Sequence, residues 1–292
     1  MPRVTIGLPV FNGAALIGEC LENLATQSYG DFDVLISDNG STDGTSEICA
    51  RVAEADQRFR HVRHAKTSSA NDNFLYVRNA AQSPYFMFRA YDDLASEDYV
   101  ERLVAVLDGA PGARLAVGAI RQEFGPAKSP RLFLYPLSRD AEAGGTARRM
   151  LHQMFRGHAS WFYGLWRRDG CIDSYDRVLA DYADPWGCDH LILLHAILSD
   201  GVRGLRAGPT FMQRVLPVPR HYIGPRRASF DEMQRRNSAF LRVAHQLLAE
   251  APVGPATRAL ISASLPLYTL IRCHGAKRLL QARARKARSP GA

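Results

Sequence analysis

The sequence predicts an α/β fold, with a mostly parallel central sheet flanked by helices and a helical C-terminal extension. Short apolar runs alternate with segments of helical spacing over residues 4–120, a pattern typical of parallel sheets covered by helices on both faces. Residues 231–249 and 256–286 have helical spacing without intervening strands. The 292 residues are enough for one large domain with an extension, or for two small domains.

The first 120 residues contain a repeated strand–helix order. Strands are predicted at residues 4–9, 32–37, 59–63, 84–88 and 115–120, because these runs are short and apolar or β-branched. Helices are predicted at residues 14–25, 45–52, 71–81 and 97–107. In residues 14–25 the apolar side chains recur at helical spacing, from Leu16 to Leu24.

The signals weaken after residue 120. Residues 125–136 are predicted to form a loop, residues 161–166 a strand, and residues 147–155 and 189–198 helices. Residues 252–255 form a Pro/Gly linker between the last two predicted helices. We therefore expect one domain with two halves, residues 1–120 and 121–225, followed by a helical extension over residues 226–292.

The net charge of +8 comes from the end of the chain. Residues 251–292 contain eight Lys or Arg and no Asp or Glu, and the other 29 basic residues balance 29 acidic ones. A nucleic-acid-binding body should carry its own basic face, so no nucleic-acid partner is expected. The basic, partly apolar segment 256–288 could lie on an anionic membrane. A solvated helix end is the alternative interpretation.

The five cysteines contain no CxxC or Cys/His ligand pattern, which favours reduced thiols in a cytosolic protein. Residues 1–5 lead directly into a strand and do not resemble a secretion signal. No uncharged stretch reaches the roughly 18–20 residues that a spanning helix needs. We expect a cytoplasmic protein that could attach peripherally to the inner face of the membrane.

Polar side chains follow three of the predicted strands. Asn12 follows the first strand, Asp38 the second, and the pair Asp92-Asp93 the fourth. Ligands of open parallel sheets bind beyond the carboxyl ends of the strands, where these side chains would meet. Adjacent carboxylates repel, and Mg²⁺ or Mn²⁺ would relieve the repulsion. As alternatives, Asp92 or Asp93 could cap the helix near Glu97, and Asp38 could serve only to stabilise a turn.

Four motifs occur in a defined order. They are Leu8-Pro9-Val10-Phe11-Asn12-Gly13, Ser37-Asp38-Asn39-Gly40-Ser41-Thr42-Asp43-Gly44-Thr45, Asn71-Asp72-Asn73-Phe74 and Asp92-Asp93-Leu94. In this order they resemble the N-terminal half of family 2 glycosyltransferases, which have the GT-A fold. The resemblance covers residues 4 to about 108.

The resemblance implies roles for several residues. Those expected to contact the nucleotide are Pro9, Val10, Phe11, Asn12, Asp38, Asn73 and Asp92. Asp38 matches the carboxylate that binds the base of a UDP-type donor. Asp93, the second acid of the family's DXD-like motif, would bind the divalent metal, Mn²⁺ or Mg²⁺. Many members carry another Asp where this chain has Ala90, which leaves the contacts to the donor sugar open.

The resemblance also implies a catalytic base in the second half. Inverting sugar transfer requires a base to deprotonate the acceptor hydroxyl, and the family places it at the start of a helix after an acceptor loop. Asp189, in Trp186-Gly187-Cys188-Asp189-His190-Leu191, fits that place. Asp184 is the runner-up and Asp181 a weaker candidate. The alternative for Asp189 is a helix N-cap.

Three further residues are candidates for the site. Trp186, beside the proposed base, and Trp161 could stack on an acceptor sugar, although core packing is the alternative for the aromatic segment around Trp161. His221 lies where many members place a histidine that contacts the metal or diphosphate. A structural role is the alternative for His221.

These residues predict an inverting glycosyltransferase. It would move a sugar from a UDP-type donor to a hydroxyl of a glycan or lipid-linked acceptor, with residues 1–120 binding the donor and 121–225 the acceptor. A nucleotidyltransferase is one alternative, but residues 11–15 lack the Gly-rich loop with a basic residue that such enzymes carry. A non-catalytic nucleotide-sugar-binding scaffold is another, and the four candidate aspartates argue against it.

Overall fold

The structure is a computed structural model that describes residues 1–124, 128–135, 145–216, 228–274, 278–281 and 283. The chain folds into two compact units. The sheet unit comprises Met1–Pro136, Ser160–Asp173 and Gly201–Leu216. The helical unit comprises Leu137–Ala159, Ser174–Asp200 and Pro217–Ala292. Each unit is therefore assembled from segments that are distant in the sequence.

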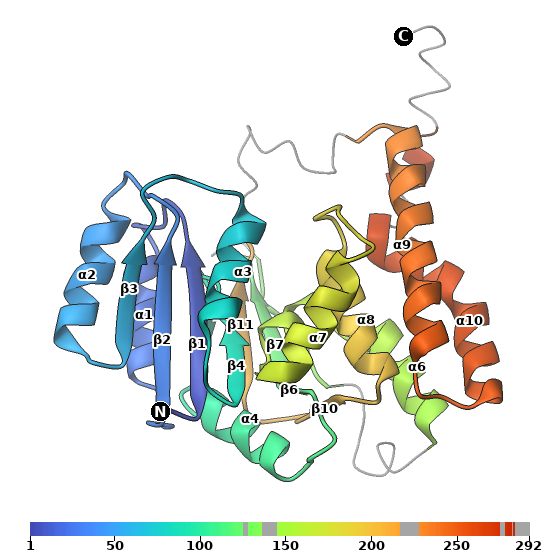
Figure 1. Cartoon of the computed structure of the whole chain (residues 1–292), viewed down its shortest axis with the longest axis horizontal. Helices are drawn as coiled ribbons and strands as arrows, with labels where there is room; N and C mark the ends of the chain where they lie inside the picture. Colours follow the sequence, from blue (N-terminus) through green and yellow to red (C-terminus); the bar gives the residue numbers. More distant parts are fainter. Residues whose placement is uncertain (125–127, 136–144, 217–227, 275–277, 282, 284–292) are drawn as a thin grey trace, which may run out of the picture. The chain divides into compact units, whose positions relative to one another are not determined.

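The sheet unit is built on a seven-stranded sheet (Figure 1). Its strands are β1 (Val4–Val10), β2 (Phe32–Asp38), β3 (Phe59–Arg63), β4 (Tyr85–Phe88), β6 (Leu115–Val117), β9 (Leu165–Arg167) and β10 (Val202–Gly204). The spatial order is β10-β6-β9-β4-β1-β2-β3. Only β9 runs antiparallel to its neighbours. The prediction of a mostly parallel α/β sheet is confirmed.

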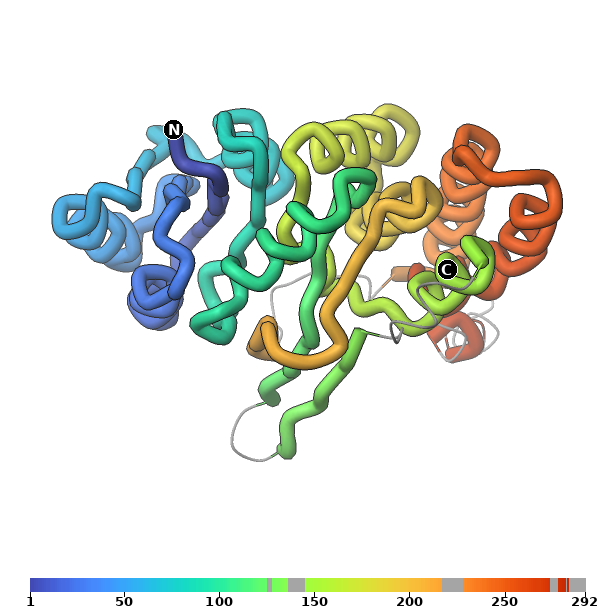
Figure 2. Tube along the Cα trace, turned by 90° about the horizontal axis from the view of Figure 1, so that it is seen from below, coloured from blue at the N-terminus to red at the C-terminus, as the bar shows by residue number. Residues whose placement is uncertain are grey.

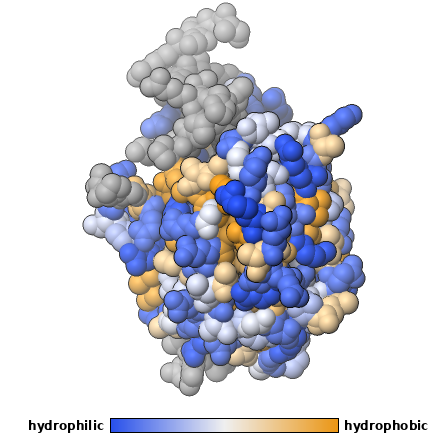
Figure 3. Space-filling model, turned by 90° about the vertical axis from the view of Figure 1, so that its left-hand side faces the viewer, coloured by the Kyte–Doolittle hydropathy of each residue, from blue (hydrophilic) through white to orange (hydrophobic). Residues whose placement is uncertain are grey.

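Helices cover this sheet because each buries one apolar side. The helices are α1 (Ile17–Ala25), α2 (Thr45–Ala55), α3 (Ala70–Ala80) and α4 (Tyr99–Asp108). Helices α1 and α3 lie on opposite faces of the sheet (Figure 2). The close approach of α3 depends on Gly7, since a Cβ there would lie 2.8 Å from Val77. Glu47, Arg51 and Glu54 of helix α2 are exposed. The face of the molecule that Figure 3 shows is largely hydrophilic.

A second sheet of four strands, in the order β5-β11-β7-β8, completes the sheet unit. These strands are β5 (Leu94–Ala95), β7 (Ala119–Glu123), β8 (Arg131–Phe133) and β11 (Thr210–Arg214). The prediction of one strand over residues 115–120 was wrong. The chain leaves the first sheet at Gly118, where a Cβ would collide with the carbonyl oxygen of Pro209, and enters the second. The predicted loop 125–136 contains β8.

The helical unit contains α6 (Thr146–Arg156), α8 (Cys188–Leu198), α9 (Phe230–Glu250) and α10 (Pro255–Thr269), with the later part of α7 (Arg168–Leu179). The helical C-terminal extension is confirmed. Two boundaries differ from the prediction. A π-helical turn, Leu270–His274, follows α10, so the α-helix predicted over residues 256–286 is interrupted. The predicted strand 161–166 is a 3₁₀ turn, Ala159–Tyr163, followed by β9.

Two predictions concern the whole chain, namely that its cysteines are reduced and that it has no membrane-spanning helix. None of the five cysteines, all of which the structure describes, is paired in a disulfide. In the described ranges, no helix has both the length and the apolar character needed to cross a membrane.

Candidate active site

The carboxyl ends of β1, β2 and β3 lie level with one another. Val10 pairs with Asp38, and Asp38 pairs with Arg63 in the parallel register. The backbone N–H of Asn39 donates to the Val10 carbonyl at 2.9 Å, and that of His64 donates to the Asp38 carbonyl at 2.8 Å. Residues predicted to bind one nucleotide from separate motifs therefore share one edge of the sheet, as expected for an open parallel sheet.

The loops after β1 and β2 are joined to each other by hydrogen bonds. Asn12 has a left-handed backbone, with φ of 51°, a conformation that Asn tolerates better than most residues. Its N–H donates to Ser41 Oγ at 2.9 Å, and its Oδ1 accepts from the Thr42 N–H at 3.0 Å. The Gly13 N–H donates to Thr45 Oγ1 at 2.8 Å. The motif residues thus hold the two loops together. The side chain of Phe11, at the start of the first loop, is 45% exposed.

Asp38 is fully buried, with an exposed fraction of 0%. Its Oδ1 accepts from the Ser41 N–H at 2.8 Å, as turn chemistry predicts. Its Oδ2 accepts no hydrogen bond in the described part of the chain. Arg63 Nε lies 3.8 Å from Oδ2 and His61 Nε2 lies 4.0 Å from it. Asp38 Oδ1 therefore stabilises the turn, whereas Asp38 Oδ2 can still accept a hydrogen bond.

Asn73 is also buried, but both of its polar atoms are engaged. Its Oδ1 accepts from Ser37 Oγ at 2.5 Å, and its Nδ2 donates to the Ser37 carbonyl at 3.0 Å. Ser37 Oγ lies 2.8 Å from His64 Nε2. The hydrogen bonds of Asn73 clamp α3 to the end of β2. Ser37 belongs to a motif of the sequence, but its hydrogen bonds to Asn73 and His64 were not predicted, because the pairing of residues so far apart leaves no local signal.

The acidic pair follows β4 on the same side of the sheet. Asp93 is 3% exposed and Asp92 is half-buried. Burial, with the neighbouring charge of Asp92, raises the pKa of Asp93 to about 7. Burial also raises the pKa of Asp92, and the charge of Arg214 opposes that rise. The pair does not cap the following helix, because β5 comes next and Asp98 is the N-cap of α4.

Strand β11 brings Arg214 to the acidic pair, a contact that was not predicted from the sequence. The Arg214 N–H donates to Asp93 Oδ1 at 2.8 Å, and the Arg214 guanidinium pairs with Glu19. Arg89, directly after β4, has an exposed fraction of 0%, and no hydrogen bond reaches its guanidinium among the described residues. Its Cζ lies 5.3 Å from the centre of the Phe211 ring. A buried cation thus lies near the acidic pair, stacked on an aromatic ring.

The chemistry of this pair suits a hard divalent cation. Both carboxyl groups resist ionisation in their surroundings, and a cation between them and a diphosphate would remove that penalty. Among the described residues, no three His, Cys, Asp or Glu side chains gather to hold a metal. Mg²⁺ usually takes only one or two carboxylates from a protein and shares the rest of its ligands between phosphate oxygens and water, and two carboxylates match that number.

Asp189 lies in the first turn of α8 in the helical unit. The N-cap of α8 is Gly187, with φ of 79°, so Asp189 is not the cap. Burial lowers the pKa of His158 to about 4 and also lowers that of His190, while the Asp189 charge opposes both changes. Asp189 itself is half-buried.

The two other candidate bases are engaged. Asp184 Oδ2 pairs with Arg236 Nε at 2.8 Å, and Asp184 Oδ1 accepts from the Trp186 N–H at 2.9 Å. Asp181 pairs with Arg177 at 2.7 Å. Their carboxylates are already neutralised, which is the arrangement of structural ion pairs.

The proposed acceptor residues differ in exposure. Trp161 is 3% exposed and packs beside Tyr135, with ring centres 5.6 Å apart. Trp186 is half-buried, and its Nε1 donates to the Cys273 carbonyl at 2.5 Å. Trp186 thus keeps part of its surface open, whereas Trp161 is part of the core. His221 lies outside the described residues.

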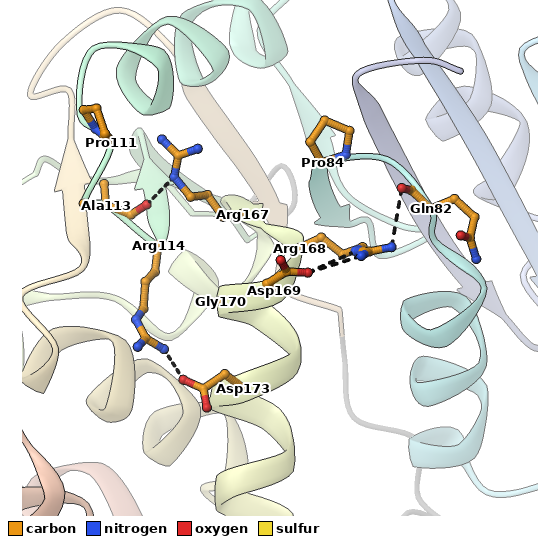
Figure 4. A pocket seen from close by; sticks show the side chains of 11 residues that line it. Gln82, Pro84, Pro111, Ala113, Arg114, Arg167, Arg168, Asp169, Gly170 and Asp173 are labelled. Carbon is orange, nitrogen blue, oxygen red and sulfur yellow. Dashed lines mark hydrogen bonds and ion pairs between the residues drawn. The ribbon is translucent and has the colours of Figure 1, made fainter.

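A hollow of about 720 Å³ opens elsewhere in the sheet unit (Figure 4). It lies at the amino end of the sheet, beside Pro84, which precedes β4, and Arg114, which precedes β6. Arg114 pairs with Asp173, and Arg168 pairs with Asp169 at 3.2 Å. The acidic pair is at the other end of the strands, so this hollow is not the candidate site.

Comparison with known proteins points to one family. The family model described as Glycosyl transferase family 2 matches residues 5–175. The chain is 32% identical over 103 residues to Glycosyltransferase GlyA of Streptococcus pneumoniae, covering 35% of this chain and 14% of GlyA. It is 27% identical over 192 residues to Validoxylamine A glucosyltransferase of Streptomyces hygroscopicus, covering 64% of this chain and 42% of that protein. The chain thus spans less than half the length of these two relatives.

Solved structures share the fold at low sequence identity. The structure of S. aureus TarS 1–349 in complex with UDP-GlcNAc superposes with a TM-score of 0.68 at 14% identity, covering 98% of this chain and 77% of that one. The mannosyltransferase PcManGT from Pyrobaculum calidifontis, in complex with GDP-Man and Mn²⁺, gives a TM-score of 0.53 at 18% identity. It covers 100% of this chain and 76% of that one. The fold is therefore of the GT-A type.

Proposed function

The chain belongs to glycosyl transferase family 2, and on that premise we propose that it transfers a sugar from a nucleotide-sugar donor to a hydroxyl group. The proposed donor is a UDP-sugar, the proposed acceptor is a glycan or lipid-linked sugar, and the reaction inverts the anomeric centre. The observation that carries the proposal is the acidic pair of half-buried Asp92 and buried Asp93 at the carboxyl end of the sheet, on the side of Asp38. Residues 1–120 would bind the donor and residues 121–225 the acceptor.

The base of the nucleotide would bind beside Asp38. Its Oδ2 accepts no hydrogen bond in the described ranges, although Arg63 lies at ion-pair distance, and an N–H of the base would satisfy it. Pro9, Val10 and Phe11 would form the adjacent wall, and the joined loops around Asn12 would hold this wall in place. The UDP and UDP-GlcNAc complexes of TarS support a uridine donor over the GDP-Man of PcManGT.

The diphosphate would bind beside the acidic pair. Asp93, with Asp92, would hold Mn²⁺ or Mg²⁺, which when bound supplies positive charge to the leaving diphosphate. The Mn²⁺ complex of PcManGT supports this assignment. The Arg214 N–H fixes Asp93 Oδ1, so Oδ2 is the oxygen left to face the ion. The charges of Arg89 and Arg214 favour the ionised form of Asp93.

Asp189 is the proposed catalytic base. Its carboxylate would take the proton of the acceptor hydroxyl as that oxygen attacks the anomeric carbon. Asp189→Asn should keep UDP affinity and abolish sugar transfer, because the amide has the same shape and no basic oxygen. Asp181→Asn is the matched control, since that acid is paired with Arg177, and it should retain transfer. Full transfer by the Asp189 variant would reassign the role to Asp184.

The metal assignment can be tested by binding alone. Isothermal titration of UDP should give tight binding with Mn²⁺ and weak binding with a chelator. In Asp93→Ala the affinity should be low under both conditions, because the variant lacks the carboxylate that holds the ion. Equal UDP affinity with and without Mn²⁺, unchanged in Asp93→Ala, would contradict the metal assignment.

A further inference from the structure

Helix α10 uses one side to pack inside the helical unit. Ile261, Leu265 and Tyr268 are buried on that side. The Tyr268 ring meets Phe155 of α6 edge-on, with ring centres 6.2 Å apart, and the Tyr268 hydroxyl donates to the His190 carbonyl at 3.1 Å. These contacts, with the pairing of α9 and α10 seen in Figure 1, fix which side of α10 faces outward.

The outward side of α10 is entirely apolar. The exposed residues from 255 to 271 are Pro255, Ala256, Ala259, Leu260, Ala263, Pro266, Leu267 and Ile271. We call this set the α10 stripe. Leu260, Leu267 and Ile271 are 50%, 54% and 49% exposed. Leu260 and Leu267 lie seven residues apart, which places them in one line along α10, and Ile271 follows in the π-helical turn after α10.

A helix that packs on a core with one side normally presents polar residues on the other. Helix α2 follows this rule with Glu47, Arg51 and Glu54. Helix α10 does not, and its stripe extends over about four turns of helix. A continuous exposed apolar strip of this kind is typical of a surface that binds a membrane or another molecule.

The charged residues in the same part of the sequence indicate which kind of partner the stripe binds. Residues 251–292 carry eight basic residues and no acidic one. Arg258 donates to carbonyls at the end of α9, including Ala249 and Ala251, and Arg272 donates to the carbonyls of Met154 and Gly157. The six others are Lys277, Arg278, Arg283, Arg285, Lys286 and Arg288. Arg278 and Arg283 are exposed.

We propose that the α10 stripe binds the surface of an anionic lipid bilayer. The stripe would enter the boundary between headgroups and acyl chains, as amphipathic helices do. The exposed Arg278 and Arg283, in a part of the sequence without acidic residues, favour anionic headgroups over neutral ones. A second copy of the chain is a poorer occupant, because a symmetric contact would bring two basic segments together without acidic partners. The inference does not rest on the proposed transferase activity.

Sedimentation of the full chain with vesicles tests the proposal. The chain should bind vesicles of phosphatidylcholine with phosphatidylglycerol, and bind pure phosphatidylcholine at least several-fold more weakly. Raising the salt from ~0.1 M to ~1 M should weaken binding to the anionic vesicles, because the Debye length falls from ~10 Å to ~3 Å. Equal binding to neutral and anionic vesicles, or no binding to either, would overturn the proposal.

A triple variant tests the stripe itself. Leu260→Gln, Leu267→Gln and Ile271→Gln together should lower vesicle affinity by about ten-fold or more, because the apolar contribution is lost. The control is Leu132→Gln with Leu134→Gln, two residues of the sheet unit that are 60% and 42% exposed, which should bind like the unmodified chain. Circular dichroism of all three proteins checks that folding is equal.

Two outcomes would contradict the assignment of the stripe. One is vesicle affinity in the triple variant equal to that of the unmodified chain. The other is a dimer of the unmodified chain, measured by analytical ultracentrifugation without lipid, that becomes a monomer in the triple variant. That second result would assign the stripe to a contact between two copies.

Discussion

At the scale of single residues, the candidate site contains buried charged groups that the fold itself does not require. Asp93 is buried beside another carboxyl group, and the guanidinium of Arg89 is buried without a hydrogen bond from the described residues. Each feature costs folding free energy, because buried charges lose hydration. Costs of this kind concentrate at functional sites, so the unliganded protein should become more stable when they are removed.

The stability of the metal-free protein should depend on the ionisation of Asp93. The pKa of Asp93 is about 7 in the folded chain, against a reference value of 3.8. Between these two pH values the folded state binds a proton that the unfolded state has released, so stability falls as the pH rises. Asp93→Asn should therefore raise the free energy of unfolding by roughly 2–4 kcal/mol at pH 8.

Urea unfolding in a chelator buffer at pH 8 and at pH 4 measures this difference. At pH 4 the difference in the free energy of unfolding should fall below about 1 kcal/mol, because Asp93 is still protonated in the folded state and pH 4 is close to its reference pKa of 3.8. The amide of Asn can still accept the Arg214 N–H, so the comparison isolates the charge. A destabilised Asn variant at pH 8, or an effect that does not change with pH, would contradict this account of Asp93.

At the scale of elements, hydrogen bonds from one helix hold the edge of the sheet together. Asn73 of α3 bonds Ser37 of β2 through two contacts, at 2.5 Å and 3.0 Å. Asn73→Ala should lower the free energy of unfolding by about 2–4 kcal/mol, since it leaves buried groups of Ser37 without partners. Asn71→Ala, at an exposed position of the same helix, is the control and should change stability little. Equal effects of the two substitutions in urea unfolding would contradict the clamp.

A second element-scale prediction concerns the passage between the two sheets at Gly118. A side chain there would meet the Pro209 carbonyl, so Gly118→Ala should cost about 1–3 kcal/mol of stability. A Cβ at Gly112 would meet no atom within 4 Å, and Gly112→Ala serves as the control. Thermal unfolding compares them, and an unchanged melting temperature in Gly118→Ala would show that β6 and β7 can separate without this glycine.

The elements also show how far sequence reasoning extends. Except for the two-residue β5, the strands and helices of residues 4–108 were predictable, because apolar runs and helical spacing are local signals. The split at Gly118 was not, because its cause is Pro209, distant in the sequence and adjacent in space. In the same way, the places of Asp38 and Asp92-Asp93 follow from strand ends, whereas the contributions of Ser37, Arg89 and Arg214 depend on long-range packing.

At the scale of the whole molecule, the two units divide the chain by kind of structure. The sheet unit carries the nucleotide-binding candidates, and the helical unit carries Asp189, Trp186 and the α10 stripe. Family membership and the GT-A fold agree with the order of motifs in the sequence. The proposals on donor, metal and base assign separate parts of one reaction to these residues, so each can fail without the others.

The release of nucleoside diphosphate from a panel of UDP-, GDP- and dTDP-sugars tests the central claim most directly. With Mn²⁺, the chain should release UDP from at least one UDP-sugar, and both a chelator and Asp93→Asn should abolish that release while the variant stays folded. Cleavage of a nucleotide sugar at the same rate by Asp93→Asn, or no cleavage of any member of the panel by the folded, metal-loaded chain, would contradict the claim.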